Sequence, residues 1–240
     1  MAGDRSPLSG RTALVTGASR GIGLAVARTL ARAGARLALL ARDARQLESA
    51  ARGLDAHVLS CDVGDDAALE SAIVAIAEQT GGAPDIIVNN AGLFELARVE
   101  DTTPGAFDAA LNVNLVAPFR LIRAFLPAMR ERRYGDIVSI GSIADHSAFA
   151  ENGAYAASKH GLRALHDVLR AELRGSGVRV TLISPGPVDT PLWDPIDPDS
   201  REGFTPRVRM LAPEAVAGAV LYAVSQPSDV DVELVRLSHS

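Results

Sequence analysis

The chain has 240 residues, 48% of them hydrophobic, which fits one α/β domain with a large core better than two small domains. A formal net charge of −5 argues against nucleic acid as a main partner, because phosphate binding needs a basic face. One cysteine excludes an internal disulfide, and neither a signal peptide nor an apolar run of membrane-spanning length is present, so we expect a soluble, cytoplasmic protein that binds no membrane.

The first predicted elements are a short strand, a glycine-rich turn and an amphipathic helix. The strand is expected over residues 12–15, the turn over Thr16–Gly23, and the helix runs to about Ala33. Glycines let the backbone approach a pyrophosphate, and the helix N-terminus offers free N–H groups and a positive dipole end. This context favours a phosphate-binding loop over a tight turn without a ligand. The predicted cofactor contacts in it are Gly17, Ser19, Arg20, Gly21, Ile22 and Gly23.

The end of the second strand, expected over residues 36–41, indicates which cofactor fits. A carboxylate there would accept hydrogen bonds from the ribose hydroxyls of NAD, but the chain has Ala41 followed by Arg42. Arg20 lies in the glycine loop on the same side. Two guanidinium groups without an acid suit a 2′-phosphate, so the predicted cofactor is NADP(H) rather than NAD(H). A surface role for Arg42, with Asp43 starting the next helix, is the alternative.

The third predicted strand covers residues 56–60 and is followed by Cys61, Asp62 and Val63. Ligands gather at the carboxyl ends of parallel strands, so Asp62 and Val63 are predicted cofactor contacts, with Asp62 accepting from an adenine amino group. Capping of the helix that starts near Asp65 is the other role open to Asp62. Cys61 is interpreted as a small buried residue rather than a reactive thiol.

The fourth predicted strand, over residues 85–88, follows a helix over residues 66–79 and ends in the turn Asn89-Asn90-Ala91-Gly92. We expect Asn89 to tie neighbouring strands together, while Ala91 and Gly92 leave room for the cofactor. All three are predicted cofactor contacts, namely Asn89, Ala91 and Gly92.

Near residue 155 an alanine-rich helix is expected to begin, and it carries Tyr155 and Lys159. Two residues four apart lie on one helix face, about 5–6 Å apart at Cβ. A nearby ammonium favours phenolate and lowers the phenol pKa from about 10, which gives a proton donor and acceptor usable near neutral pH. A surface pair without function is the alternative that this pattern alone leaves open.

Three motifs now stand in order along the chain: Thr16–Gly23, Asn89–Gly92 and Tyr155-x-x-x-Lys159. Together they resemble the signatures of the short-chain dehydrogenase/reductase family, and the resemblance extends over residues 11–237. Strands that alternate with helices predict one Rossmann-like domain, a doubly wound parallel sheet with helices on both faces. The resemblance implies seven strands in the order 3-2-1-4-5-6-7.

The resemblance implies two further catalytic residues besides Tyr155 and Lys159. Asn114 lies in a long helix expected from Pro104 to about residue 132, and it is similar to the family's helical Asn, whose local kink holds a water for proton relay. Ser142 follows the strand expected at 136–140 and stands thirteen residues before Tyr155, as in the family. Its hydroxyl is expected to donate to a substrate carbonyl. Ser139 is the other candidate for this role, but it falls inside the strand.

The C-terminal third is expected to complete the cofactor site. After a sixth strand at 178–183, the chain resembles the family's Pro-Gly turn, whose backbone contacts the nicotinamide carboxamide. Residues 187–212 are interpreted as a substrate loop or lid, with a passive surface loop as the alternative. A last helix from Pro213 and a seventh strand at 230–235 follow. Implied cofactor contacts are Pro185, Gly186, Val188 and Thr190, together with Tyr155 and Lys159.

The predicted function is NADP(H)-dependent interconversion of a carbonyl and a secondary alcohol, with a non-catalytic dinucleotide sensor or the same chemistry with NAD(H) as alternatives. A methyltransferase is disfavoured because that class of enzyme needs an acidic residue near the end of the second strand to bind a ribose. No histidine has metal-like spacing, so no metal is expected. We expect a homo-oligomer, a dimer or tetramer, and a flexible N-terminus over about residues 1–10. Predicted substrate contacts are Leu93, Phe94, Ala144, His146, Pro187 and Trp193.

Overall fold

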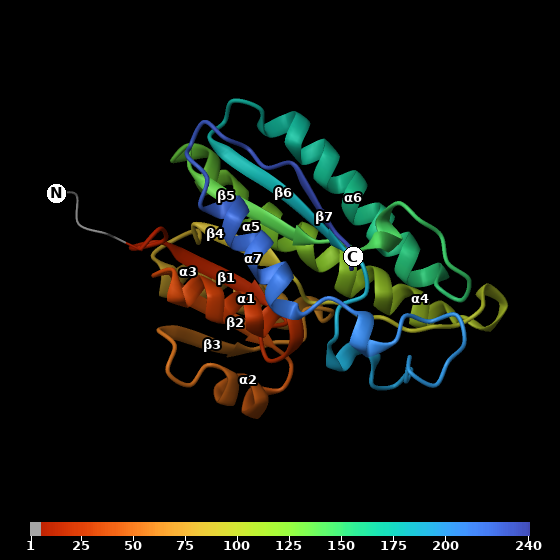
Figure 1. Ribbon diagram of the computed structural model, residues 1–240. Helices are drawn as coiled ribbons and strands as arrows, with labels where there is room; N and C mark the ends of the chain where they lie inside the picture. The colour runs from red at the N-terminus through yellow and green to blue at the C-terminus, as the bar shows by residue number, and fades with distance from the viewer. Residues whose placement is uncertain (1–5) are drawn as a thin grey trace.

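Seven strands form one sheet in the order β3-β2-β1-β4-β5-β6-β7 in the computed structural model, which describes residues 6–240 (Figure 1). Every neighbouring pair of strands is parallel. The predicted fold class and strand order are therefore confirmed. The strands are β1 (Thr12–Thr16), β2 (Arg36–Ala41), β3 (Ala56–Ser60), β4 (Ile86–Asn89), β5 (Gly135–Ile140), β6 (Val178–Pro185) and β7 (Leu234–Leu237).

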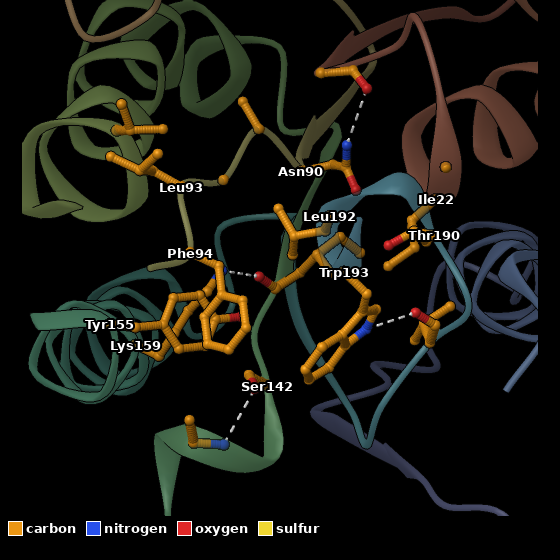
Figure 2. Close-up of a pocket in the computed structure, with 18 of the residues that line it drawn as sticks. Ile22, Asn90, Leu93, Phe94, Ser142, Tyr155, Lys159, Thr190, Leu192 and Trp193 are labelled. Carbon is orange, nitrogen blue, oxygen red and sulfur yellow. Dashed lines mark hydrogen bonds between the residues drawn. The ribbon is translucent and has the colours of Figure 1, made fainter. Parts of the chain in front are cut away.

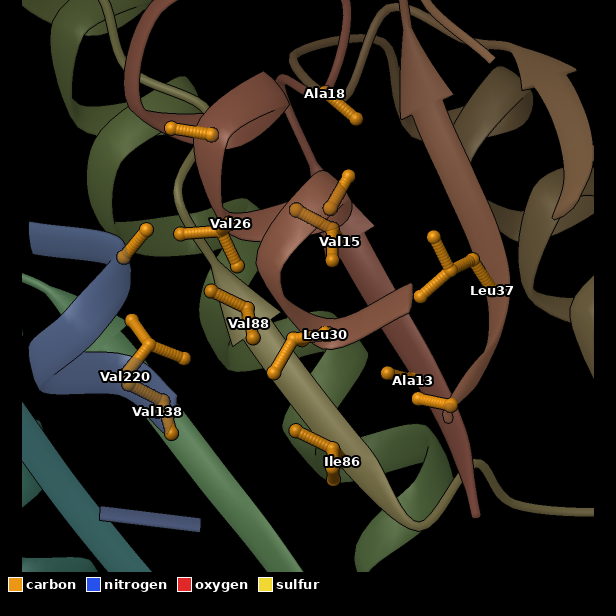
Figure 3. Close-up of a cluster of buried hydrophobic side chains, with 14 of the residues drawn as sticks. Ala13, Val15, Ala18, Val26, Leu30, Leu37, Ile86, Val88, Val138 and Val220 are labelled. Atoms are coloured by element: carbon orange, nitrogen blue, oxygen red, sulfur yellow. The ribbon is translucent and has the colours of Figure 1, made fainter. Parts of the chain in front are cut away.

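Helices cover both faces of this sheet (Figure 1). On one face, Val26 and Leu30 of a first helix and Val220 of the last helix meet the strands (Figure 3). The helices of this face are α1 (Gly21–Arg32) and α7 (Pro213–Val224), and those of the opposite face are α3 (Asp66–Thr80), α5 (Ala117–Glu131) and α6 (Gly153–Leu173). Two shorter helices are α2 (Ala44–Ala50) and α4 (Pro104–Leu111).

Successive residues of the inner strands supply the two opposite cores. Val15 of β1 and Val88 of β4 lie in the core beneath α1 and α7, whereas Leu14 and Ile87 lie in the core beneath α3 and α5. Because side chains alternate across a strand, a strand buried on both faces must be apolar throughout. This explains the nearly unbroken runs of Ala, Val, Leu and Ile in β1, β2 and β4.

The helix predicted from Pro104 to about residue 132 is a continuous helical run with a π-helical turn, η2 (Asn112–Val116), between α4 and α5. Single π turns inside α-helices often occur at functional sites, and this one holds the buried Asn114. The run Pro104–Glu131 is also long and apolar enough to cross a membrane by length and composition. In the fold, its residues Leu121 and Phe125 pack into the core beneath the sheet, as in a core helix.

The last strand lies further along the chain than predicted. β7 pairs through Leu234–Leu237 with β6, which itself runs to Pro185, so the expected strand at 230–235 was wrong. Residues before Leu234 have other partners: Asp231 and Glu233 pair with Arg170 of α6 at 2.7 and 3.4 Å. The Glu233 carbonyl still accepts from the Leu182 N–H of β6 at 3.0 Å, so the acidic residues lie directly before the paired part of the strand.

Packing at the N-terminal end begins before β1. Leu8 is fully buried, and its N–H donates to the Ala33 carbonyl at 2.9 Å. The predicted flexible N-terminus thus includes residues that pack against the end of α1, while its first part, residues 1–5, lies outside the described residues.

Candidate active site

A cavity of about 1160 Å³ opens at the carboxyl ends of the strands, where loops after β1, β2, β4, β5 and β6 converge. In open parallel sheets ligands bind at this edge, where the strand order reverses. The cavity brings together most of the predicted site residues: Gly17, Ser19, Arg20, Gly21, Ile22, Arg42, Asp62, Val63, Ala91, Gly92, Leu93, Phe94, Ser142, Ala144, Tyr155, Lys159, Pro185, Gly186, Pro187, Val188, Thr190 and Trp193. Four predicted residues are not in its wall: Gly23, Asn89, Asn114 and His146.

The glycine loop is shaped by close approaches that a side chain would prevent. Gly17 has a φ of +66°, and a Cβ there would lie 2.9 Å from the Nδ2 of Asn90. A Cβ on Gly23 would lie 2.2 Å from the carbonyl oxygen of Gly17. Gly23 therefore lets the first turn of α1 pack onto the loop, and its predicted contact with the cofactor stays a prediction.

Two exposed arginines line the cavity beside this loop. Within the described part of the chain, the side chains of Arg20 and Arg42 have neither an ion pair nor a hydrogen bond. The neighbouring Asp43 is occupied, because its carboxylate caps α2 by accepting from the Gln46 N–H at 2.9 Å. The Ser19 hydroxyl donates to the Gln46 Oε1 at 3.0 Å and joins the loop to α2. The site therefore offers two cations without carboxylate partners.

The turn after β4 is tied to β1 by Asn90, not by Asn89 as predicted. The Nδ2 of Asn90 donates to the Thr16 carbonyl at 2.8 Å, and the Thr16 hydroxyl accepts from the N–H groups of Asn90 and Ala91 at 3.0 and 2.9 Å. Asn89 is buried, and its amide has no hydrogen-bond partner among residues 6–240. Adjacent residues point to opposite sides, so only the second Asn reaches β1 and the cavity.

Ser142 lies directly after β5 and begins a short 3-10 helix, η3 (Ile143–Asp145). Its hydroxyl accepts from the Ala144 N–H at 3.1 Å, and Ser142 lines the same cavity as Tyr155 (Figure 2). The expected competitor Ser139 is buried inside β5. Of the two serines, the structure brings only Ser142 to the cavity.

Tyr155 and Lys159 share one face of α6, with the Lys159 Nζ 5.5 Å from the centre of the phenol ring (Figure 2). Lys159 is buried and donates to the Ile140 carbonyl at 2.8 Å. Burial lowers the pKa of Lys159 to about 8, against the opposing charge of Asp145. Burial also raises the pKa of Tyr155 to about 12, and Asp145 adds to the rise while the Ser142 hydrogen bond opposes it.

The predicted lowering of the Tyr155 pKa by Lys159 is therefore wrong for this structure. Desolvation of the phenolate is the largest cause of the raised pKa, and the Lys159 ammonium donates to the Ile140 carbonyl. Near neutral pH the phenol is fully protonated, so this arrangement holds a proton donor in the cavity.

Asn114 lies behind the cavity wall. Its Oδ1 accepts from the Leu93 N–H at 2.8 Å, while its Nδ2 donates to the Leu93 carbonyl and the Ser158 hydroxyl, both at 2.9 Å. Ser158 in turn donates to the Tyr155 carbonyl at 2.7 Å. Asn114 thus fixes the loop after β4 against α6, and its predicted link to Lys159 through water stays a prediction.

Asp145 is a residue that sequence reasoning missed. Its buried carboxylate accepts from the Ser142 N–H at 3.3 Å and from the Ser184 hydroxyl, and lies 3.6 Å from the Nη1 of Arg163. His146 contacts the same carboxylate through Nδ1 at 2.7 Å, which explains why it is not in the cavity wall. The capping-box spacing from Ser142 to Asp145 was the available signal.

The predicted substrate loop, residues 187–212, forms part of the cavity wall through Thr190, Trp193 and Phe204. A Cβ on Gly21 would lie 3.2 Å from the Thr190 side chain, so this segment abuts the glycine loop. Arg207 braces the segment by donating to the Asp189 carboxylate at 2.8 Å. Leu192 also lines the cavity, and sequence reasoning did not single it out, because no motif marks it.

Comparisons with known proteins agree with this geometry. The family model described as short chain dehydrogenase matches residues 11–201. An uncharacterized oxidoreductase of Staphylococcus aureus is 34% identical over 233 residues, which cover 96% of this chain and 97% of the relative. A second, from Staphylococcus saprophyticus, is 35% identical over 236 residues, covering 96% and 97%.

Solved structures lead to the same conclusion. A metagenomic short-chain oxidoreductase in complex with NADP is 34% identical with a TM-score of 0.83, covering 98% of this chain and 100% of that one. A putative gluconate dehydrogenase from Agrobacterium tumefaciens is 30% identical with a TM-score of 0.86, covering 95% and 94%. The chain therefore belongs to the short-chain dehydrogenase family of oxidoreductases.

Proposed function

We propose that this protein is an NADP(H)-dependent oxidoreductase that interconverts a carbonyl and a secondary alcohol. One observation carries the proposal: Ser142, the Tyr155 phenol and a buried Lys159 share one cavity with a glycine loop. Membership of the family supports oxidoreductase chemistry at this site. The solved relative that holds NADP supports the choice of cofactor.

The residues present fit a phosphorylated dinucleotide. Gly17 and Gly23 keep the loop backbone and the first turn of α1 free of side chains, which a pyrophosphate requires. Arg20 and Arg42 have guanidinium groups without carboxylate partners, which suit the 2′-phosphate of NADP. Asp62 lines the same end of the cavity, although its Oδ1 already accepts from the Gly64 N–H at 3.0 Å.

When bound, the nicotinamide would supply or accept the hydride at the substrate carbon. In the direction of reduction, Tyr155 donates its proton to the carbonyl oxygen and regains one from solvent. The Ser142 hydroxyl, which lines the same cavity, donates a hydrogen bond to the substrate oxygen. Lys159 uses one of three donors on Ile140 and keeps the others for the ribose hydroxyls of the cofactor.

The test is the variant Tyr155→Phe, which removes the transferable proton and keeps the ring. We expect turnover to fall by about 10²–10⁴-fold, the usual contribution of a general acid. NADPH binding, followed by fluorescence, should be unchanged. Tyr222→Phe, at an exposed tyrosine of α7, is the matched control and should keep full activity. Undiminished turnover in the Tyr155 variant would refute the assignment.

The alternatives predict other outcomes. A dinucleotide sensor would bind NADPH tightly and reduce no member of a broad carbonyl panel. An NAD-dependent enzyme would show comparable kcat/KM for NADH and NADPH. A homo-oligomer, dimer or tetramer, and a cytoplasmic location stay predictions; the exposed Phe119 of α5 and Val168 of α6 are consistent with a helix-mediated interface.

A further inference from the structure

Aromatic side chains are concentrated around the catalytic phenol. The chain has only ten aromatic residues, six Phe, three Tyr and one Trp, and half of them line this cavity. They come from segments far apart in the sequence, namely Phe94, Phe149, Tyr155, Trp193 and Phe204. The core is otherwise built mainly from Ala, Val, Leu and Ile. This enrichment identifies the part of the cavity around Tyr155, called the aromatic end below, as an aromatic binding surface.

The rings make a connected edge-to-face series. Phe94 lies 4.8 Å from Tyr155 at an interplanar angle of 68°, and 5.3 Å from Trp193 at 70°. Trp193 continues to Phe204 at 6.4 Å and 82°. Figure 2 shows Phe94 in front of Tyr155 with Trp193 beside it. A flat ring attached to the reacting carbon can therefore meet Phe94 and Trp193 while its carbonyl oxygen reaches Tyr155.

Hydrogen bonds hold two of these rings in place. The indole Nε1 of Trp193 donates to the Val188 carbonyl at 3.0 Å. The backbone N–H and carbonyl of Leu93, directly before Phe94, are both bound by the Asn114 amide at 2.8 and 2.9 Å. Rings that are already fixed lose little conformational entropy when a ligand binds.

The charges around the aromatic end oppose an anionic substrate. Within residues 6–240, the cations in the cavity wall are Arg20 and Arg42 at the glycine-loop end, and Lys159, which donates to the Ile140 carbonyl. Glu202, two residues before Phe204, lines the wall and adds negative charge. The nearby Arg201, 4.9 Å from the centre of the Phe204 ring, is already paired with Glu151 at 3.2 Å, so a substrate carboxylate or phosphate would lose its hydration here without gaining an unpaired cation.

We propose that the substrate is an uncharged aryl ketone or aldehyde, with the aromatic ring next to the carbonyl and seated against Phe94 and Trp193. This inference rests on the proposed function, because it names the compound on which Tyr155 acts. Edge-to-face aromatic contact strengthens binding by up to about tenfold beyond the effect of the apolar area that it buries.

Three matched methyl ketones test the proposal: acetophenone, cyclohexyl methyl ketone and 4-acetylbenzoate. The first two differ in aromaticity, and the third adds a negatively charged para-carboxylate to acetophenone. We expect kcat/KM with NADPH to be about tenfold higher for acetophenone than for the cyclohexyl compound, and lowest for 4-acetylbenzoate. Calorimetric titration of each ketone into the NADP⁺-bound protein, where no reduction occurs, should give the same order of affinity.

Variants show whether the rings cause the preference. Phe94→Leu keeps apolar area and removes one ring, so kcat/KM should fall more for acetophenone than for the cyclohexyl ketone, and the aryl-to-cyclohexyl ratio should approach one. Phe204→Leu should have a smaller effect in the same direction, because that ring is further from Tyr155. Tyr222→Leu, on the exposed face of α7, is the control and should keep the wild-type ratio. The melting temperature and NADPH affinity verify that each variant is folded.

The outcomes separate this inference from the proposed function. Ketone reduction without an aryl preference, a preference for 4-acetylbenzoate, or an equal loss for both neutral ketones in Phe94→Leu would overturn the inference and leave the proposed function intact. Aryl-selective binding to the NADP⁺-bound protein without reduction of any ketone would overturn the proposed function and leave the aromatic site as a binding site.

Discussion

Replacing Arg42 with alanine tests the cofactor assignment most directly. A charge-assisted hydrogen bond contributes about 1.5–3 kcal/mol. Arg42 is exposed at the edge of the cavity, where water and salt weaken its field, so we take the lower end of that range. About 1.5 kcal/mol corresponds to about a tenfold loss of NADPH affinity. NADH has no 2′-phosphate, so its affinity should change by less than about twofold.

The assay is equilibrium titration of both cofactors by fluorescence, with the variant Arg45→Ala as control. Arg45 is an exposed arginine of α2, three residues away, and does not line the cavity. Its loss should leave both affinities nearly unchanged. Raising the salt from about 50 to about 500 mM should shrink the effect of Arg42→Ala, because screening shortens the range of the charge. Equal losses for NADPH and NADH would refute the 2′-phosphate contact.

Two more predictions concern residues whose roles come from the structure. Asp145→Asn removes a negative charge that raises the pKa of Lys159, so the pKa of Lys159 should fall below its present value of about 8. The alkaline decline in the rate of reduction should then begin at lower pH. An unchanged pH profile would contradict this. Gly23→Ala places a Cβ 2.2 Å from the Gly17 carbonyl oxygen and should cost about 1–3 kcal/mol, lowering the melting temperature by several degrees. Its control is Gly218→Ala in α7, where a Cβ meets nothing within 4 Å and better helix propensity should stabilise the protein by up to about 1 kcal/mol; similar melting temperatures for the two variants would show that the loop tolerates the Cβ.

Local sequence patterns predicted the elements well wherever the signal lies within a few residues. The apolar runs of β1 and β4, the glycines after β1 and the Pro104 that opens α4 all appear where expected. The seventh strand begins later than expected, at Leu234, and the acidic residues before it pair with Arg170, about sixty residues away in the chain. The alternating pattern alone cannot show at which residue the pairing with β6 begins.

Local sequence patterns also could not distinguish the roles of the two asparagines after β4. Asn89 and Asn90 look equivalent in the sequence, and only the direction in which β4 ends decides that Asn90 reaches Thr16. Asp145 likewise looks like a helix cap, yet burial between Ser142 and Ser184 makes it part of the site's electrostatics.

The sequence by itself determined the sheet, the glycine loop and the spacing of Ser142, Tyr155 and Lys159, because these depend on backbone conformation and helical period. Only the tertiary structure decided that the phenol is buried enough to keep its proton, and that Phe94, Trp193 and Phe204 meet around it. Desolvation and ring contacts depend on atoms brought together from distant segments, and no local pattern encodes them.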